Sequence, residues 1–197
     1  MLIPVPADEA ERLSELQVLG LMEAGREAAY DDLVKLVSQW CEVPMAAVTL
    51  IDAQTQWLKA RVGLDVEQLP RPQSFCTHAI LNPQQLLIVP DTHQDPRFAN
   101  NPLVTGEPFL RFYAGAPLLT AGGVTLGALC VMDTRPRQLT PLQLQSLAVL
   151  AQQICALIEL HRKQRLLEQQ RGFLRTVIDS LHEGLIIRDA ERRLSLA

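Results

Sequence analysis

The stretch FYAGAPLLTAGGVTLGALCVMD, residues 112–133, contains two apolar runs of strand length separated by a pair of glycines. The first run covers residues 112–119 and the second covers residues 124–133, and apolar runs of this length are typical of buried strands. Gly122 and Gly123 supply the positive φ angles that a tight hairpin turn needs. The stretch therefore predicts an antiparallel β-hairpin.

Three further strands are expected before this hairpin. The segment AAVTLID, residues 46–52, is an apolar run, and QWLKARVG, residues 56–63, follows it after the short loop AQT. This spacing is typical of a second hairpin. The segment LLIVPD, residues 86–91, predicts one more strand, which brings the expected total to five.

Two helices are expected near the N-terminus. Asp8 and Glu11 have the spacing of a capping box, and leucines follow them at helical intervals. A clearer apolar stripe at the 3.6-residue period predicts a second helix, which Pro44 ends. The members of this stripe are Tyr30, Leu33, Val34, Val37, Trp40 and Cys41.

A long helix is predicted to begin after residue 140. Thr140 suits the N-cap, Pro141 the first helical position and Gln143 the third. Apolar residues then recur in steps of three and four, and from residue 160 onward leucines stand seven apart, which is the coiled-coil repeat. The predicted apolar seam comprises Leu147, Leu150, Ile154, Leu157, Leu160, Leu167, Leu174 and Leu181.

This helix, residues 141–182, is expected to pair with its copy in a parallel homodimer. Its length would be roughly 63 Å, which is more than a domain of this size needs for its own core. Gln164 and Arg171 fall within the seam, where polar residues weaken association but fix the register. For residues 141–158, packing on their own domain is the other interpretation, and the two roles are compatible.

The composition is that of a soluble globular protein. Of 197 residues, 48% are hydrophobic and 20% are charged, and the formal net charge of -4 gives no basic footprint for nucleic acid. No apolar run approaches the roughly 18 residues that cross a bilayer, so no membrane span is expected. No secretion signal is recognised, and Cys41, Cys76, Cys130 and Cys155 show no CxxC spacing. We therefore expect reduced thiols in a cytoplasmic protein.

Several motifs together resemble the GAF domains found at the N-termini of bacterial sensor histidine kinases and diguanylate cyclases. They lie within residues 7–158 and comprise EAERLSEL, VTLIDAQTQWLKARVGLD, SFCTHAI, VPDTHQDPRFANNPLV and LRFYAGAPLLTAGGVTLGALCVMD. The resemblance implies an α+β fold with a central antiparallel sheet of about five or six strands and flanking helices. It also implies a ligand pocket on one side of the sheet and a long C-terminal signalling helix.

Three segments are expected along the chain. Residues 1–158 form the GAF sensor domain, and residues 159–172 form a helical linker that continues the coiled coil. Residues 173–197 resemble the opening of a PAS domain, with a short helix that ends at Gly184 and two strands after it. Because a helix and two strands cannot bury a core of their own, the sequence is expected to stop inside a second domain.

The segment SFCTHAI, residues 74–80, places a cysteine two residues before a histidine. The resemblance puts this segment on a short helix beside the pocket, and Ser74 is a suitable cap for it. Residues two apart on a helix do not face each other, so Cys76 and His78 are not expected to act together. Cys76 is expected to be a small buried hydrophobe. In bilin-attaching GAF domains histidine directly follows the cysteine, whereas Thr77 intervenes here, so no covalent bilin is expected.

The segment DTHQDPRFANNP, residues 91–102, carries two aspartates, a histidine and an arginine. Nothing in the pattern makes these side chains converge, so no metal site is predicted. In one interpretation Asp95 caps a turn and Arg97 bridges to a carboxylate or a backbone carbonyl. In the other interpretation Arg97 or Arg111 binds an anionic group of a ligand.

The pocket is expected to be mostly apolar with a few polar points, as small-molecule pockets are. The polar candidates are Thr49, Cys76, His78 and Tyr113. The full set of candidate pocket residues is Thr49, Trp57, Phe75, Cys76, His78, Arg97, Phe98, Arg111 and Tyr113.

The expected function is that of a regulatory sensor module rather than an enzyme. The module would bind an unidentified small ligand, or sense a partner, and shift a dimeric helix between two packings that an output domain reads. The resemblance implies a histidine kinase or a diguanylate cyclase as the output domain, and no cofactor is identified. Two alternatives stay open: a free methionine sulfoxide reductase that uses Cys76 and Cys130, and a dimerising spacer whose pocket has lost its ligand.

Overall fold

The computed structural model describes residues 4–21 and 27–194, with side chains described up to residue 180. The helices are α1 (Glu9–Leu19), α2 (Ala28–Trp40), α3 (Cys76–Ala79), α4 (Pro102–Thr105) and α5 (Pro141–Leu194), with a 3-10 turn at Arg71–Gln73. The strands are β1 (Met45–Ile51), β2 (Thr55–Val62), β3 (Gln68–Pro70), β4 (Leu87–Val89), β5 (Phe112–Leu119) and β6 (Thr125–Asp133). The chain divides into two compact units, residues 1–157 and 158–197.

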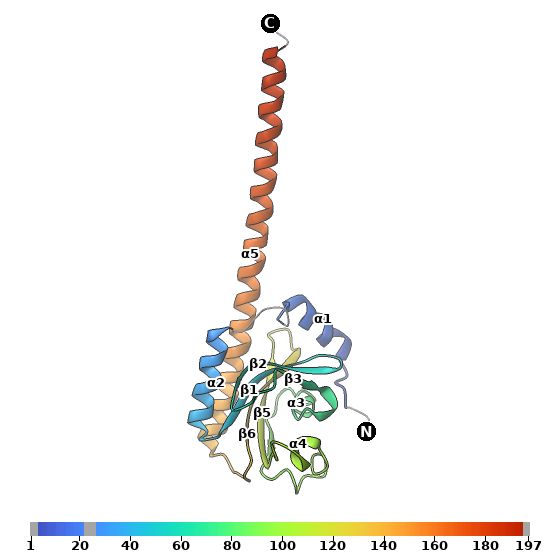
Figure 1. The fold of residues 1–197 in the computed structure, drawn as a ribbon, viewed down its shortest axis with the longest axis vertical. Helices are drawn as coiled ribbons and strands as arrows, with labels where there is room; N and C mark the ends of the chain where they lie inside the picture. Colours follow the sequence, from blue (N-terminus) through green and yellow to red (C-terminus); the bar gives the residue numbers. More distant parts are fainter. Residues whose placement is uncertain (1–3, 22–26, 195–197) are drawn as a thin grey trace. The chain divides into compact units, whose positions relative to one another are not determined.

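The first unit is built on one antiparallel sheet with the strand order β3-β2-β1-β6-β5-β4 (Figure 1). The predicted hairpin of residues 112–133 forms β5 and β6, with Ala114 opposite Val131 and Gly115 opposite Cys130. Gly123 has a φ of 85° in its turn, as predicted, whereas Gly122 does not adopt the positive φ expected for it. The α+β fold class is therefore confirmed.

One strand was not anticipated from the sequence. β3 has only three residues, and it ends at Pro70, which cannot donate a ladder hydrogen bond. β3 pairs with β2 at the edge of the sheet, where a proline can be accommodated. A segment this short carries no recognisable alternation of apolar and polar residues.

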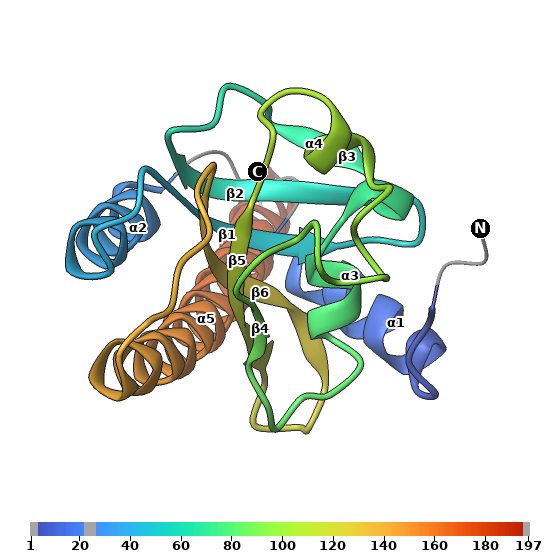
Figure 2. The same ribbon diagram turned by 90° about the horizontal axis from the view of Figure 1, so that it is seen from below.

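Helices cover both faces of the sheet. α2 and the first turns of α5 lie on one face, and α3 and α4 lie on the other (Figure 2). The apolar stripe of α2 explains its position, because Tyr30, Val34 and Val37 are fully buried over β1 and β2. Trp40, which was placed on the same stripe, is half exposed at the end of the helix.

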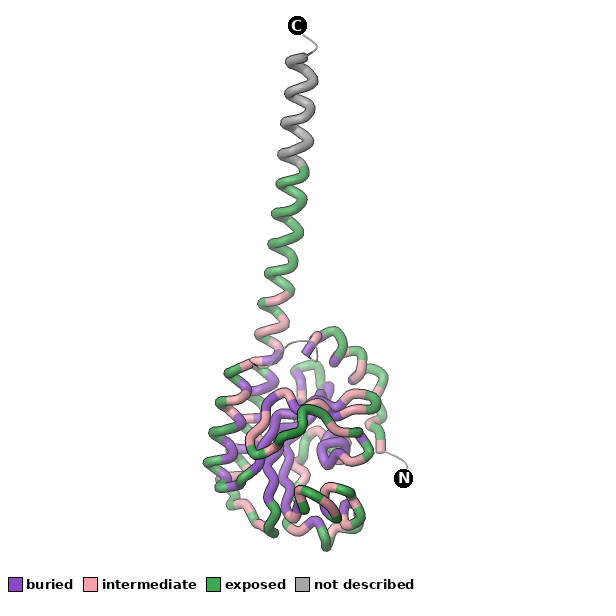
Figure 3. The backbone as a smooth tube through the Cα atoms, viewed as in Figure 1, coloured by how far each residue is buried: buried purple, intermediate pink, exposed green. Residues whose placement is uncertain are grey.

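The buried residues of the first unit are concentrated along the strands (Figure 3). All residues of β1 and β6 are buried, as expected for strands covered on both faces. On the α3 side, a hydrophobic cluster joins β1, β5 and β6 to α3, and it contains Phe75, Cys76, Phe98, Tyr113 and Cys130. This cluster forms the wall beneath the candidate site described below.

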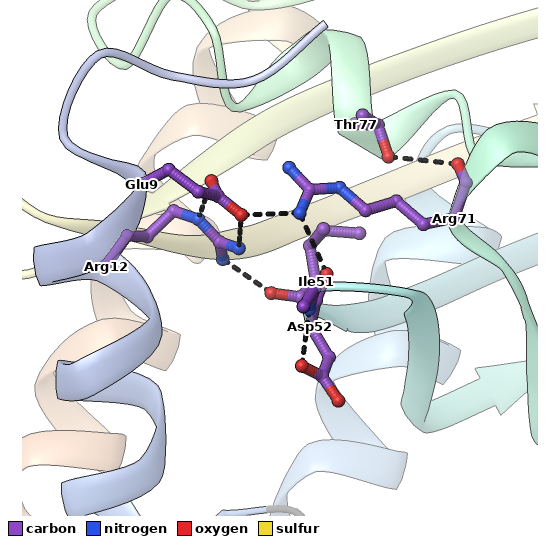
Figure 4. A network of polar contacts seen from close by, with 7 residues as sticks. Glu9, Arg12, Ile51, Asp52, Arg71 and Thr77 are labelled. Atoms are coloured by element: carbon purple, nitrogen blue, oxygen red, sulfur yellow. Dashed lines mark hydrogen bonds and ion pairs between the residues drawn. The ribbon is translucent and has the colours of Figure 1, made fainter. Parts of the chain in front are cut away.

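A buried charge network anchors α1 to the sheet (Figure 4). Arg12 and Arg71 are at most 1% exposed, and both guanidinium groups contact the carboxylate of Glu9. Arg12 also donates to the backbone carbonyl of Ile51, and Arg71 donates to that of Asp52. Burial raises the pKa of Glu9, but the hydrogen bonds from the two arginines outweigh this and lower the pKa to about 2.

The two predicted capping boxes have different outcomes. At α5, the backbone amide of Gln143 donates to Thr140 Oγ1, and the amide of Thr140 donates to Gln143 Oε1, which confirms the prediction. At α1, Asp8 stands at the N-cap but its side chain makes no capping hydrogen bond. The acidic side chain that anchors this helix is Glu9, because it forms ion pairs with two buried arginines.

α5 is longer than the sequence predicted. It continues as a helix through Gly184 to Leu194, so the two strands expected after Gly184 are wrong for residues 185–194. A helix satisfies its backbone hydrogen bonds locally, whereas a pair of strands with no sheet to join leaves most of them to water. Residues 195–197 lie outside the described residues.

The predicted apolar seam of α5 changes role along the helix. Leu147 and Ile154 are fully buried, so these two residues belong to the core of the first unit, which corrects their assignment to a dimer seam. Leu160, Leu167 and Leu174 are at least half exposed. The side chain of Leu181 lies outside the described residues.

Part of α5 has the length and composition of a membrane-spanning helix. An 18-residue window within residues 141–180 has a mean hydropathy of 1.3, and 28% of that window is buried. One such helix is weak evidence of a membrane span, because a core helix of a soluble protein has the same properties.

Candidate functional site

A cavity of about 360 Å³ lies in the first unit, over the face of the sheet that carries α3. Its volume falls at the lower end of the range for small-molecule sites, roughly 300–1,000 Å³. The residues that line it are Ala47, Gln56, Leu58, Gly63, Leu64, Asp65, Val66, Leu69, Ser74, Phe75, Cys76, Leu103, Glu107, Pro108, Leu110, Tyr113 and Met132. They come from β1, β2, β3, β5, β6, the start of α3, α4, and the loops after β2 and α4.

A fully buried tyrosine shapes one wall of this cavity. A Cβ atom at Gly115 would lie 2.3 Å from the phenolic oxygen of Tyr113, so glycine at this position lets the ring lie along β5. The ring of Tyr113 stacks on Phe75 at 5.1 Å between centroids, and Phe75 stacks on Phe98 at 4.2 Å. This aromatic column fixes the start of α3 against the sheet.

Two thiols meet beneath the same wall. The sulfur atoms of Cys76 and Cys130 are 3.8 Å apart, and Tyr113 donates its hydroxyl to Cys76 Sγ at 3.2 Å. Burial raises the pKa of Cys76, but hydrogen bonds with Cys130, Thr49 and Tyr113 outweigh it and lower this pKa. The pKa of Cys130 is raised well above its usual value by the hydrogen bond with Cys76 and by burial. Burial also raises the pKa of Tyr113.

The polar side chains inside the cavity bind one another. Ser74 donates its hydroxyl to the amide oxygen of Gln56, and the same hydroxyl accepts from the backbone N–H of Thr77 at 3.0 Å. Ser74 thereby caps α3, as the sequence predicted, and connects the helix to β2. Because these groups are already partnered, the cavity presents a mainly apolar interior.

Three of the nine predicted pocket residues line the cavity: Phe75, Cys76 and Tyr113. Thr49 lies on β1 opposite Leu58, where its hydroxyl donates to the carbonyl of Ala128 and its side chain also hydrogen-bonds Cys76, although it does not line the cavity. Trp57 lies between Gln56 and Leu58 on β2, so strand alternation turns its side chain to the opposite face. The prediction for Trp57 is corrected by the structure, whereas Thr49 contacts a cavity residue from behind the wall.

The predicted cationic candidates also lie away from the cavity. Arg97 makes two hydrogen bonds to Asp95, and Arg111 makes two to Asp91, so each guanidinium fork already holds a carboxylate. The first pairing is the structural interpretation of the loop, in which Asp95 also accepts from the backbone N–H of Arg97. Arg97 and Arg111 therefore do not line this cavity, although Arg97 and His78 line a second, separate hollow of about 390 Å³.

His78 and Phe98 form the outer side of the aromatic column. Their rings meet edge to face at 4.8 Å, and neither residue lines the cavity. Burial and the nearby guanidinium of Arg97 lower the pKa of His78, which favours the neutral imidazole. The described structure does not bring His78 to Cys76, and no group of three potential metal-binding side chains occurs among the described residues.

Sequence reasoning missed the rim of the cavity. The rim comes from the loop after β2, with Leu64, Asp65 and Val66, and from the segment after α4, with Glu107 and Pro108. The available signal was the occurrence of apolar side chains in loops that connect short elements. Val66, for example, is an apolar residue that is 50% exposed in the loop between β2 and β3.

Comparison with known proteins identifies this architecture. The family model of the GAF domain matches residues 25–158. The chain belongs to the GAF domain family. A curated relative, a cyclic di-GMP phosphodiesterase of Pseudomonas aeruginosa, is 45% identical over 134 residues, which are 68% of this chain. The chain spans only 23% of the length of that relative.

Solved structures with the same fold come from several contexts. The GAF domain of an Acinetobacter phosphoenolpyruvate-protein phosphotransferase has a TM-score of 0.58 and 19% identity, covering 79% of this chain and 95% of that domain. A domain of a two-component sensor histidine kinase from Sinorhizobium meliloti, described as putative in its title, has a TM-score of 0.56 and 16% identity, covering 72% and 97%. A free methionine-R-sulfoxide reductase of Thermoplasma acidophilum has a TM-score of 0.55 and 13% identity, covering 66% and 90%. These similarities show the fold alone.

Proposed function

We propose that this GAF domain is the regulatory sensor of a cytoplasmic signalling protein. It binds a small molecule in the cavity beside α3, and the occupied and empty forms differ in how α5 packs against its copy. The observation that carries the proposal is the cavity of about 360 Å³ over the sheet, in a domain whose last helix continues without a break to Leu194. Ligand control of this kind requires different affinities for the two packings.

The exposed apolar residues of α5 support pairing with a second copy. Leu160, Leu167 and Leu174 recur every seven residues and are 50%, 57% and 58% exposed. Burying them between two parallel helices removes apolar surface from water. Gln164 and Arg171 fall between them in the seam, where polar residues weaken association and favour a helix that can switch.

The proposed output is an enzyme of cyclic di-GMP signalling. The relative in Pseudomonas aeruginosa is named a cyclic di-GMP phosphodiesterase, and the shared region is a small part of its length. In this proposal the catalytic domain lies elsewhere in the full protein, and the GAF domain regulates it. A PAS domain after α5, and a kinase or cyclase as the output domain, are the alternatives within the same proposal for the rest of the full protein.

Native mass spectrometry and sedimentation together test the sensor proposal. The chain of residues 1–197, purified without denaturation, is expected to carry a co-purified small molecule and to form concentration-dependent dimers. Removing the molecule by refolding should change the dimer dissociation constant. A chain with no bound molecule, whose association is unchanged by cell extract metabolites, would contradict the proposal and favour a spacer.

A second candidate function is reduction of free methionine sulfoxide. The observation that favours it is the 3.8 Å distance between the sulfur atoms of Cys76, which lines the cavity, and Cys130 behind it. In such a reaction the two thiols form a disulfide, and the sulfoxide becomes a thioether with release of water. Against it, both cysteines are only 1% exposed, whereas reactive cysteines are partly accessible. Turnover of methionine sulfoxide with a thiol reductant would decide for this candidate.

A further inference from the structure

The charges around the cavity have one sign. Asp65 and Glu107 are both exposed and both line the cavity, so they stand where it meets solvent. Among the described residues that line it, none is lysine, arginine or histidine. The opening therefore presents negative charge to any approaching molecule.

Several arginines near the lining residues in sequence already have acidic or carbonyl partners, and Arg71 among them pairs with Glu9. Arg61 donates to the carbonyl of Leu64 and forms an ion pair with Glu67 at 2.9 Å. Arg97 and Arg111 hold Asp95 and Asp91 in bidentate pairs. A phosphate or carboxylate group in the cavity would compete with a protein carboxylate for each of these guanidinium groups.

The interior offers few unpaired hydrogen-bonding groups. Gln56 and Ser74 are bonded to each other, and the hydroxyl of Tyr113 is donated to Cys76. The remaining wall is formed by aliphatic side chains, among them Leu58, Leu110 and Met132. Burying a charged anion against such a mainly aliphatic wall is costly.

We propose that the cavity selects a small, mainly apolar molecule that is neutral or carries an amine, and that it rejects phosphate- and carboxylate-bearing ligands. The proposal rests on the sensor function above and names the class of its ligand. It separates the sensed molecule from cyclic di-GMP, whose two phosphates would face Asp65 and Glu107 with no cationic partner. The nucleotide that the relative's name mentions is then the substrate of an output domain and not the signal that this domain reads.

A matched series of ligands tests this class directly. Phenethylamine, phenethyl alcohol and phenylacetate share one aromatic body and differ in charge, and cyclic di-GMP serves as the nucleotide probe. Each is titrated into the chain of residues 1–197 by isothermal titration calorimetry at low salt. Phenethylamine is expected to bind about tenfold more tightly than phenylacetate, because the carboxylates of Asp65 and Glu107 attract the amine and repel the carboxylate. Phenethyl alcohol is expected to have an intermediate affinity. Cyclic di-GMP is not expected to bind. Added salt should reduce the preference for the amine.

Two double variants locate the origin of the preference. Asp65→Asn with Glu107→Gln removes both rim charges, and the ratio of amine to carboxylate affinity should fall by about the same tenfold factor. Asp32→Asn with Glu42→Gln removes two charges from exposed positions that do not line the cavity, and the ratio should stay unchanged. Equal thermal stability of the two double variants would show that folding is not the cause.

The outcomes separate the ligand class from the sensor function. Tighter binding of phenylacetate or of cyclic di-GMP would overturn the proposed class, while the sensor function would stand. A preference that both double variants retain would overturn the role of the rim carboxylates. Failure of every probe to bind would overturn the class, and native mass spectrometry of the same sample would then decide whether the cavity holds any molecule at all.

Discussion

The sulfur atoms of Cys76 and Cys130 lie 3.8 Å apart, although 54 residues separate them in the sequence. Cys76 opens α3 and Cys130 lies in β6, so their proximity reports how α3 packs on the middle of the sheet. Both side chains are 1% exposed, and the hydroxyl of Tyr113 completes the group. The pair is therefore a packing contact of the cavity wall as well as a potential redox pair.

The structural role of Cys76 can be tested by substitution. Cys76→Ser is expected to keep the fold and to lower the free energy of unfolding by about 1–2 kcal/mol, because a hydroxyl is harder to bury than a thiol. Ligand binding should change only moderately. Chemical denaturation and maleimide labelling of the native protein provide the measurements, with slow labelling expected for a buried thiol.

Fast labelling of Cys76 near neutral pH would contradict this interpretation. It would show that the thiolate, which the neighbouring hydrogen bonds stabilise, is accessible in solution. Cys130→Ser is the companion variant, since it removes the second thiol of the pair from β6 and leaves the Cys76 thiol in α3. Loss of a methionine sulfoxide reductase activity in both variants would promote the second candidate function.

Arg97 is expected to stabilise its loop and not to bind the ligand. Its guanidinium holds Asp95 and lies 5.1 Å from the ring centre of Phe98. Arg97→Ala should lower the free energy of unfolding by about 1 kcal/mol, since the ion pair is partly exposed. The decrease in melting temperature should be equal with and without ligand, as measured by thermal unfolding.

A different result for Arg97→Ala would restore its predicted role in binding. If the free protein kept its melting temperature and lost only the ligand-induced increase, Arg97 would contact the ligand. The reason is that a ligand stabilises the folded state by an amount that depends on its concentration relative to its dissociation constant. Arg111→Ala is a suitable comparison, since Arg111 holds Asp91 in the same bidentate geometry.

The acid sensitivity of the domain should depend on Glu9. Its pKa is about 2 in the folded protein and 4.5 ordinarily, so folding favours the charged carboxylate. The stability that Glu9 contributes is complete above about 4.5 and is lost as the pH falls toward 2. At neutral pH, Glu9→Gln should cost about 3 kcal/mol, because it leaves two buried guanidinium groups without their carboxylate.

The measurement for Glu9 is the free energy of unfolding from pH 7 down to pH 2. The difference between the native protein and Glu9→Gln should shrink as the pH falls through this window. Glu11→Gln, an exposed acid on the same helix, should show no such convergence. A constant difference across the whole range would mean that Glu9 acts through packing and not through its charge.

The elements that could be predicted from the sequence are those whose signal is local. The hairpin of residues 112–133 combines two apolar runs with a glycine turn, and the stripe of α2 follows the helical period, so both were recognised. β3 was missed because three residues show no period. The strands expected after Gly184 rested on a short resemblance, and the helix of α5 continues through them instead.

The candidate site was less predictable because it is assembled from distant segments. Phe75, Cys76 and Tyr113 were found through the resemblance, which placed α3 beside the pocket. The rim residues Asp65 and Glu107 lie in loops whose positions depend on the whole fold, so no local pattern indicated them. Arg97 and Arg111 were expected as possible anion contacts, and only the structure shows which carboxylates they hold.

The dimer seam of α5 is the last feature that mutation can test. Leu160→Glu with Leu167→Glu places two carboxylates in each helix at positions that are otherwise half exposed and apolar. In a parallel dimer these four charges would face one another, so the dissociation constant should rise at least tenfold, which corresponds to about 1.4 kcal/mol.

Gln169→Glu with Thr176→Glu adds the same charge to exposed positions outside the predicted seam and should leave association unchanged. Analytical ultracentrifugation over a range of concentrations measures both. A chain that stays monomeric at the highest concentration, or two double variants that weaken it equally, would exclude the heptad leucines as the contact.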